Sequence, residues 1–128
     1  MSINRKIMVI DDEQDILKLV QTALKKYGYE VDIFSEPKKA LAYFNKHHRD
    51  YGLLLVDIRM PGMSGIEFAR HARQVAPEVK LLLTTAFETT AQEIQKDLEF
   101  ISTDDLLRKP FTLSRICKAI EKHLGRRT

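Results

Sequence analysis

The chain has 128 residues, 44% of them hydrophobic and 30% charged, and its 21 Lys and Arg against 18 Asp and Glu give a net charge of +3. This size and balance predict a single globular domain over residues 1–128 with an ordinary apolar core. One cysteine excludes an internal disulfide, and so mild a charge does not by itself indicate nucleic-acid binding. The apolar runs are too short to cross a bilayer and no signal peptide opens the chain, so we expect a cytoplasmic protein.

Short β-rich segments alternate with longer segments of helical periodicity. We expect strands at residues 6–10, 30–34, 52–57, 80–84 and 105–108. We expect helices at 14–27, from 37 to about 47, at 66–75, from 90 to about 98, and from a cap at 112 to 125. Gly28 is a stop signal for the first helix, whereas Ser35 and Thr112 can cap the second and the last.

The strands are apolar on both faces, which is typical of a parallel sheet covered by helices on each side. Alternation of strands with helices then predicts an α/β fold, a doubly wound five-stranded parallel sheet with five helices. In such folds the ligand site lies beyond the carboxyl ends of the strands.

Polar side chains occur at the carboxyl ends of four strands. They are Asp11, Asp12 and Glu13 after the first strand, Asp57 at the end of the third, Thr84 and Thr85 at the fourth, and Lys109 after the fifth. Carboxylates packed together repel one another, and Mg²⁺ relieves that conflict because it prefers carboxylate and substrate oxygens. A carboxylate can also accept a phosphoryl group covalently, and a lysine can neutralise a phosphoryl oxygen. Each of these residue types therefore has a role if the chemistry is phosphoryl transfer to Asp57.

Four motifs, in order along the chain, are similar to those of a known family. They are Ile7-Met8-Val9-Ile10-Asp11-Asp12-Glu13, Leu54-Leu55-Val56-Asp57-Ile58-Arg59-Met60-Pro61-Gly62-Met63-Ser64-Gly65, Thr85-Ala86 and Lys109-Pro110-Phe111. Together they resemble the receiver domain of two-component response regulators over roughly residues 5–125. The resemblance implies a flavodoxin-like sheet with strand order 2-1-3-4-5.

The resemblance also implies roles at a Mg²⁺ site. Asp57 would be the phosphoacceptor and a metal ligand. Asp12 would bind Mg²⁺ directly, Asp11 would act mainly through a metal-bound water, and the backbone carbonyl of Arg59 would complete the protein ligands.

Two further residues would contact the phosphoryl group by the same resemblance. Thr85 and Lys109 would bind its oxygens, and the peptide bond from Lys109 to Pro110 is expected to be cis, which X-Pro bonds permit.

The chain departs from the family pattern at a few positions. Leu106 stands where the family usually has the Tyr or Phe that follows the threonine in a rotamer switch. Ser102-Thr103 replaces a small Gly-Ala pair, and Arg59 and Phe87 occupy variable positions expected to tune hydrolysis.

The implied function is regulatory. A sensor histidine kinase or phosphotransfer protein would donate the phosphoryl group, and the domain would catalyse only its own phosphorylation and slow dephosphorylation. The surface of helix four, strand five and helix five would then change its preference for a downstream protein target. A homodimer through helices four and five is possible, without membrane or direct nucleic-acid contact. The chain is either a stand-alone regulator or the receiver part of a longer one.

Other interpretations stay open from residues alone. A haloacid-dehalogenase-type phosphatase also combines Asp, Mg²⁺ and Lys, but with an Asp-x-Asp motif after strand one, where this chain has Glu13. A phosphorylation-independent binding module would fit Leu106. Asp11 and Asp12 could cap the first helix. His123 lacks zinc-spaced partners and is expected to be solvated.

Overall fold

Five parallel strands form one sheet in the computed structural model, which describes residues 6–86, 105–110 and 112–125. The strand order is β2-β1-β3-β4-β5, as predicted. The strands are β1 (Lys6–Ile10), β2 (Glu30–Phe34), β3 (Tyr51–Asp57), β4 (Lys80–Ala86) and β5 (Leu106–Lys109). Every neighbouring pair is parallel, so all the carboxyl ends meet at one edge of the sheet.

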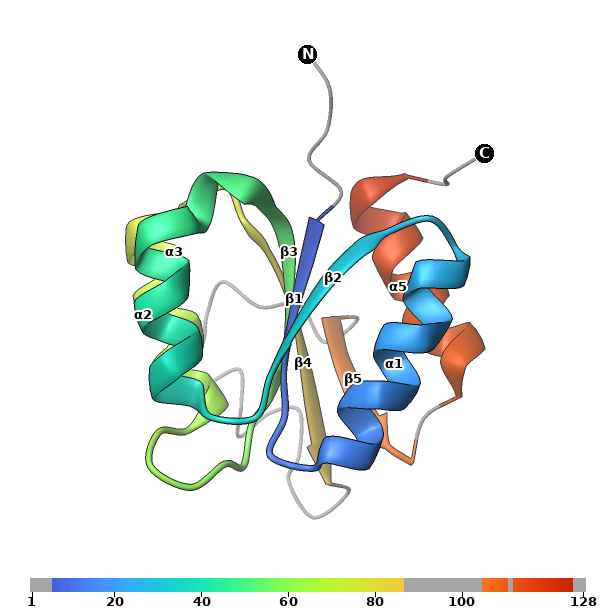
Figure 1. The fold of residues 1–128 in the computed structure, drawn as a ribbon, viewed down its shortest axis with the longest axis horizontal. Helices are drawn as coiled ribbons and strands as arrows, with labels where there is room; N and C mark the ends of the chain where they lie inside the picture. The colour runs from blue at the N-terminus through green and yellow to red at the C-terminus, as the bar shows by residue number, and fades with distance from the viewer. Residues whose placement is uncertain (1–5, 87–104, 111, 126–128) are drawn as a thin grey trace.

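Helices cover both faces of the sheet, as Figure 1 shows. They are α1 (Gln14–Lys26), α2 (Pro37–His47), α3 (Gly65–Val75) and α5 (Leu113–Leu124), with a 3-10 turn η1 (His48–Asp50). The helices α2 and α3 lie on one face and α1 and α5 on the other. The helix expected from residue 90 to about 98, together with Phe87, Ser102-Thr103 and Phe111, lies outside the described residues.

The alternation of side chains along each strand divides the core into two layers. On β1, Ile7 and Val9 pack in the layer beneath α1 and α5, whereas Met8 and Ile10 pack in the layer beneath α2 and α3. The central strand β3 follows the same rule with two leucines in the first layer and Leu54 and Val56 in the second. A strand buried on both faces needs this continuous apolar run, which is the signal that predicted it.

Helix ends agree with the sequence at some positions and not at others. The hydroxyls of Ser64 and Thr112 accept hydrogen bonds from backbone N–H groups in the first turns of α3 and α5, at 3.2 Å in each case. The predicted cap at Ser35 is wrong, because Glu36 precedes α2 and makes no side-chain cap bond, while Pro37 opens the helix. Proline suits the first helical position because its φ is already fixed near the helical value and it has no N–H to satisfy there, so Pro37 marks where α2 begins.

The ends of β4 and β5 fall later than predicted. Strand β4 runs to Ala86, so Thr84 and Thr85 are strand residues and not its last positions. Strand β5 begins at Leu106 and includes Lys109 as its final residue. Pairing with β4 through Ala86 and Lys109 explains this shift, because hydrogen bonds to a neighbouring strand extend a segment whose own apolar pattern is short.

The expectation for His123 is also wrong. Its Nε2 lies 2.7 Å from Oδ1 of Asp105, and both side chains are largely buried. The pair joins the end of α5 to the start of the β5 region, a contact between residues 18 positions apart that no local pattern reveals.

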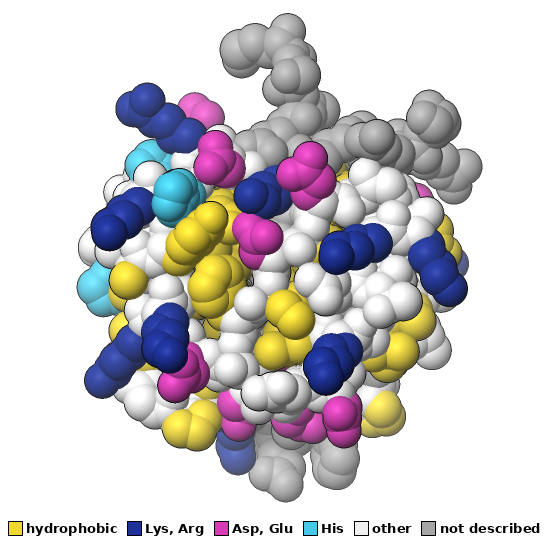
Figure 2. Space-filling view, viewed as in Figure 1, with side chains coloured by type: hydrophobic (Ala, Val, Ile, Leu, Met, Phe, Trp, Pro, Cys, Tyr) yellow, Lys and Arg dark blue, Asp and Glu magenta, His cyan; other side chains and the backbone are white. Residues whose placement is uncertain are grey.

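The surface shows no single basic patch on the face drawn in Figure 2, where Lys and Arg side chains are spread between acidic and apolar ones. Acidic side chains gather along the lower edge of that face, where Figure 1 places the loop after β1. Within the described residues, no helix has the combination of length and apolar character that a bilayer span requires.

Candidate functional site

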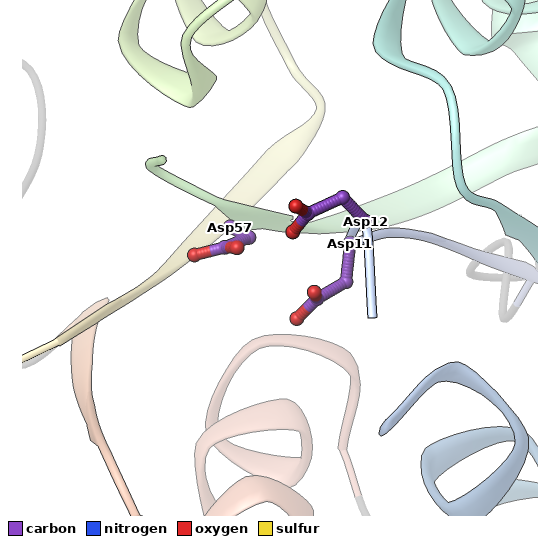
Figure 3. Close-up of side chains that lie close together, drawn as sticks. All are labelled: Asp11, Asp12 and Asp57. Carbon is purple, nitrogen blue, oxygen red and sulfur yellow. The ribbon is translucent and has the colours of Figure 1, made fainter. Parts of the chain in front are cut away.

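The register of the sheet brings together acidic residues that are far apart in the sequence. Ile10 at the end of β1 pairs with Val56 on β3, so Asp11 and Asp57 follow as neighbours at the same edge. Oxygen atoms of Asp11, Asp12 and Asp57 all lie within 4.8 Å of one another. Figure 3 shows the three side chains gathered in one small region, two from the chain after β1 and one from the end of β3. The predicted acidic cluster is therefore present.

Asp11 is held from several sides. Its backbone N–H donates to the carbonyl of Phe34 at 3.1 Å, which ties the end of β1 to β2. Its Oδ1 accepts from the backbone N–H of Glu13 at 2.9 Å, a local turn that helps begin α1. The N-cap residue of α1 is Glu13, and its side chain makes no cap bond. The alternative role of Asp11 as a helix cap is therefore limited to the turn that it forms with Glu13. The other oxygen of Asp11 remains available to Lys109.

Lys109 reaches the acidic cluster from the end of β5. Its Nζ lies 3.0 Å from Oδ2 of Asp11, 3.4 Å from Oδ2 of Asp57 and 3.4 Å from Oε1 of Glu13. The peptide bond between Lys109 and Pro110 is cis, as expected. The lysine is thus an integral part of the site and not the solvated lysine that Lys-Pro alone would suggest.

Thr85 and Arg59 occupy different surroundings. Thr85 is fully buried on β4, one residue beyond Thr84, which pairs with Asp57 across the sheet. The carbonyl of Thr84 accepts a hydrogen bond from the N–H of Ile58 at 2.9 Å, so β4 fixes the chain as it leaves Asp57. Arg59 is exposed and follows in the loop that leads to α3.

Burial and neighbouring negative charges make this site unfavourable for an ionised carboxylate. The pKa of Asp57 is raised to about 6, first by burial and second by the charge of Asp11, while Lys109 acts in the opposite direction. Burial also raises the pKa of Asp11 despite its hydrogen bonds to Glu13 and Lys109. For Lys109, burial lowers the pKa, but the hydrogen bond and charge of Asp11 outweigh it and the net direction is upward. One ammonium therefore does not fully compensate the acidic groups around it.

The donor set fits a hard divalent cation. The oxygens of Asp11, Asp12 and Asp57 are close enough to share one ion, and the side chains of Asp11 and Asp57 are buried. A cation there would favour the ionised form of Asp57, against the burial and the charge of Asp11 that raise its pKa. In the described part of the chain, this is the only such grouping of possible ligands.

Comparison with known proteins decides the family. Residues 7–121 match the family model described as the response regulator receiver domain. The chain belongs to this family. The role of a receiver domain is regulatory.

Individual relatives agree with the assignment. This receiver domain is 35% identical over 120 residues to the response regulator receiver protein CpdR of Brucella abortus, covering 94% of this chain and 97% of CpdR. It is 33% identical to the transcriptional regulatory protein YrkP of Bacillus subtilis, covering 96% of this chain but 51% of YrkP. The crystal structure of a receiver domain protein from Clostridium thermocellum superimposes with a TM-score of 0.85 at 28% identity, covering 94% of each chain.

The structure assigns importance to a glycine that the sequence marked only as part of a motif. A Cβ atom on Gly65 would lie 2.2 Å from the carbonyl oxygen of Asp57 and 2.8 Å from Cα of Ile58. The N–H of Gly65 also donates to the carbonyl of Ile58 at 2.8 Å. The start of α3 therefore packs directly against the backbone of Asp57. A glycine directly after the Ser64 cap was the available signal.

Glu13 is the second residue whose place the sequence did not reveal. It follows the acidic pair, but nothing in its spacing indicates that its carboxylate lies 3.4 Å from the ammonium of Lys109, 96 positions away. That contact depends on β1 and β5 delivering their ends to one edge of the sheet.

Proposed function

We propose that this receiver domain accepts a phosphoryl group on Asp57 in a Mg²⁺-dependent reaction and thereby changes its protein partners. The phosphoryl donor is a sensor histidine kinase or a phosphotransfer protein. The observation that supports this most directly is the position of Asp57, a buried carboxylate beside two further carboxylates and 3.4 Å from the ammonium of Lys109.

Asp57, Lys109 and Thr85 have different roles in the transfer of the phosphoryl group. A carboxylate oxygen of Asp57 attacks phosphorus, so an O–P bond forms while the P–N bond of the donor phosphohistidine breaks. The imidazole leaves with the electrons of that bond and a proton from solvent. Lys109 and Thr85 hold oxygens of the transferred group, the lysine as a positive charge and the threonine as a hydrogen-bond donor.

The acidic residues prepare the site for this transfer. We assign Asp11, Asp12, Asp57 and the backbone carbonyl of Arg59 as the residues that hold Mg²⁺. The bound ion supplies charge neutralisation, which lets an anionic phosphoryl group approach an anionic carboxylate. The existing geometry of Asp11, fixed by Glu13 and Phe34, keeps one carboxylate in place before any ion arrives.

The consequences of phosphorylation lie at the surface. We infer that movement of Thr85 toward the new phosphoryl group alters the surface of β5, α5 and the helix predicted from residue 90 to about 98, and so the affinity for a downstream protein target or for a second copy of the domain. We further infer that residues 1–128 act as one cytoplasmic receiver domain that neither binds nucleic acid directly nor contacts membranes. Slow loss of the phosphoryl group by hydrolysis resets the switch.

The decisive experiment is intact-mass analysis after incubation with acetyl phosphate and Mg²⁺. The wild type is expected to gain one phosphoryl group, and Asp57→Asn is expected to gain none. Asp15→Asn is the matched control, since Asp15 is an exposed acid in the first turn of α1, and it is expected to behave as the wild type does. Failure of the folded wild type to gain mass from acetyl phosphate or from any kinase partner would contradict the proposal.

Two further measurements test the details. Mg²⁺ should raise the melting temperature of the wild type more than that of Asp12→Asn or Asp57→Asn. An ion that binds only the folded state stabilises that state, and each substitution removes one of its ligands. Peptide mapping should locate the phosphoryl group on Asp57. A phosphoryl group found on Asp11, together with rapid hydrolysis of a phosphomonoester substrate, would instead indicate a phosphatase.

A further inference from the structure

The ammonium of Lys109 is surrounded by carboxylates in this structure, and it donates hydrogen bonds to Asp11 and Glu13. An ammonium carries three N–H donors, and three carboxylates lie around this one. Its Nζ is 3.0 Å from Asp11, 3.4 Å from Asp57 and 3.4 Å from Glu13. A phosphoryl oxygen that binds Lys109 therefore competes with these carboxylates for the ammonium.

The three acceptors differ in how readily they can leave. The side chain of Asp11 is 4% exposed and is also tied to a backbone N–H, and that of Asp57 is 6% exposed and is the group that accepts the phosphoryl. The side chain of Glu13 is 60% exposed. An exposed carboxylate returns to water at little cost, since exposed ion pairs contribute weakly to stability. Glu13 is thus the acceptor that can be exchanged.

We propose that Glu13 is a positioning residue that occupies, from the solvent side, the place on Lys109 that a phosphoryl oxygen takes during transfer. The inference rests on the proposed function, because it assigns Lys109 to the phosphoryl group. Glu13 keeps the ammonium directed into the site before the donor arrives, and it competes with the phosphoryl oxygens when the donor binds. Its carboxylate therefore slows phosphorylation relative to a neutral side chain of the same shape.

The test compares phosphorylation rates of the wild type, Glu13→Gln and Asp15→Asn with acetyl phosphate at a fixed Mg²⁺ concentration, followed by intact mass. Glu13→Gln is expected to react about two- to five-fold faster, the range that corresponds to loss of one weak, exposed ion pair. Asp15→Asn removes the same charge two residues further along, in the first turn of α1, and is expected to change the rate less. Circular dichroism and the melting temperature establish that both variants are folded.

A second readout separates competition at Lys109 from a general effect on the domain. In the phosphorylated state Glu13 has already left Lys109, so the hydrolysis rate of Glu13→Gln should stay within about two-fold of the wild type, the low end of the same range. A variant that merely loosened the site would change phosphorylation and hydrolysis together.

Each outcome is distinguishable. A wild type that takes no phosphoryl group removes the proposed function and this inference with it. A wild type that is phosphorylated, together with Glu13→Gln that is unchanged or slower, overturns the role of Glu13 alone. Equal acceleration by Asp15→Asn and Glu13→Gln would attribute the effect to overall charge and would also overturn it.

Discussion

The interior of the sheet and the carboxyl ends of its strands obey opposite rules, although the same strands build both. Along β3, four apolar residues from Leu53 to Val56 are at most 2% exposed, and the next residue, Asp57, is a carboxylate that is only 5% exposed. Burying the apolar run stabilises the fold, because it removes hydrocarbon from water. Burying the carboxylate costs free energy, because it removes a charge from water.

The contrast shows how the domain can carry a reactive site. Two apolar layers provide the stability, so the edge of the sheet can hold several acids around one ammonium. The raised pKa of Asp57 measures the unfavourable environment there, and it is the environment that a cation or a phosphoryl contact to Lys109 would relieve. Mutations should therefore have opposite signs in the two regions.

The largest effect is expected in the interior. Leu24 on α1 is 1% exposed and Leu19 on the same helix is 57% exposed. Leu24→Ala should lower the free energy of unfolding by about 2–5 kcal/mol, because it leaves a cavity in the layer beneath α1 and α5. Leu19→Ala is the matched control and should change stability by less than about 0.5 kcal/mol. Urea denaturation measures both, and similar losses for the two variants would contradict this account of the core.

The next effect is expected where the interior meets the edge, at Gly65. Gly65→Ala places a methyl group against the backbone of Asp57 and Ile58, which cannot yield as a flexible side chain can. We expect a loss of about 3 kcal/mol, the upper part of the usual range for overpacking, and slower phosphorylation because Asp57 is displaced. Gly52→Ala is the comparison substitution, because Gly52 lies near the start of β3, at the opposite end of the strand from Asp57. Phosphorylation of Gly65→Ala at the wild-type rate would show that the contact does not position Asp57.

The sequence predicted the interior better than the edge, for a physical reason. Burial on both faces needs a continuous apolar run and helices need a 3.6-residue period, so β3 and α1 were found within one residue of their bounds. Motifs also placed Asp11, Asp57 and Lys109 at one edge. The contact of Glu13 with Lys109 depends on how two distant strand ends meet, and that information is not local.

Errors at segment ends have the same origin. Pairing with β4 extended β5 to Lys109, and the partly buried pair of His123 with Asp105 joins residues of α5 and of the β5 region that are 18 positions apart. Ser35 has the right chemistry for a cap, but α2 begins at Pro37 after Glu36. Tertiary contacts decide such details, and a local propensity is only a weak prior against them.

The smallest effect, and the one of opposite sign, is expected at Asp57. Without divalent ions at pH 7, Asp57→Asn should raise the free energy of unfolding by about 2 to 3 kcal/mol, because a neutral amide avoids the cost of a buried charge. The folded-state pKa of Asp57 is about 6 and its ordinary value is 3.8, so the folded protein binds a proton between these values that the unfolded chain does not. Wild-type stability attributable to this group therefore falls as the pH rises from about 3.8 to about 6.

The pH dependence distinguishes this cause from any other benefit of the substitution. The advantage of Asp57→Asn should be complete above pH 6 and should vanish below pH 3.8, where the carboxyl is protonated in both states. Glu30→Gln, at the exposed start of β2, is the control for removal of one negative charge. Urea denaturation in a chelating buffer at several pH values measures the difference. An advantage that persists unchanged at low pH would mean that charge burial does not set the cost of Asp57, and the edge of the sheet would then differ from its interior in shape alone.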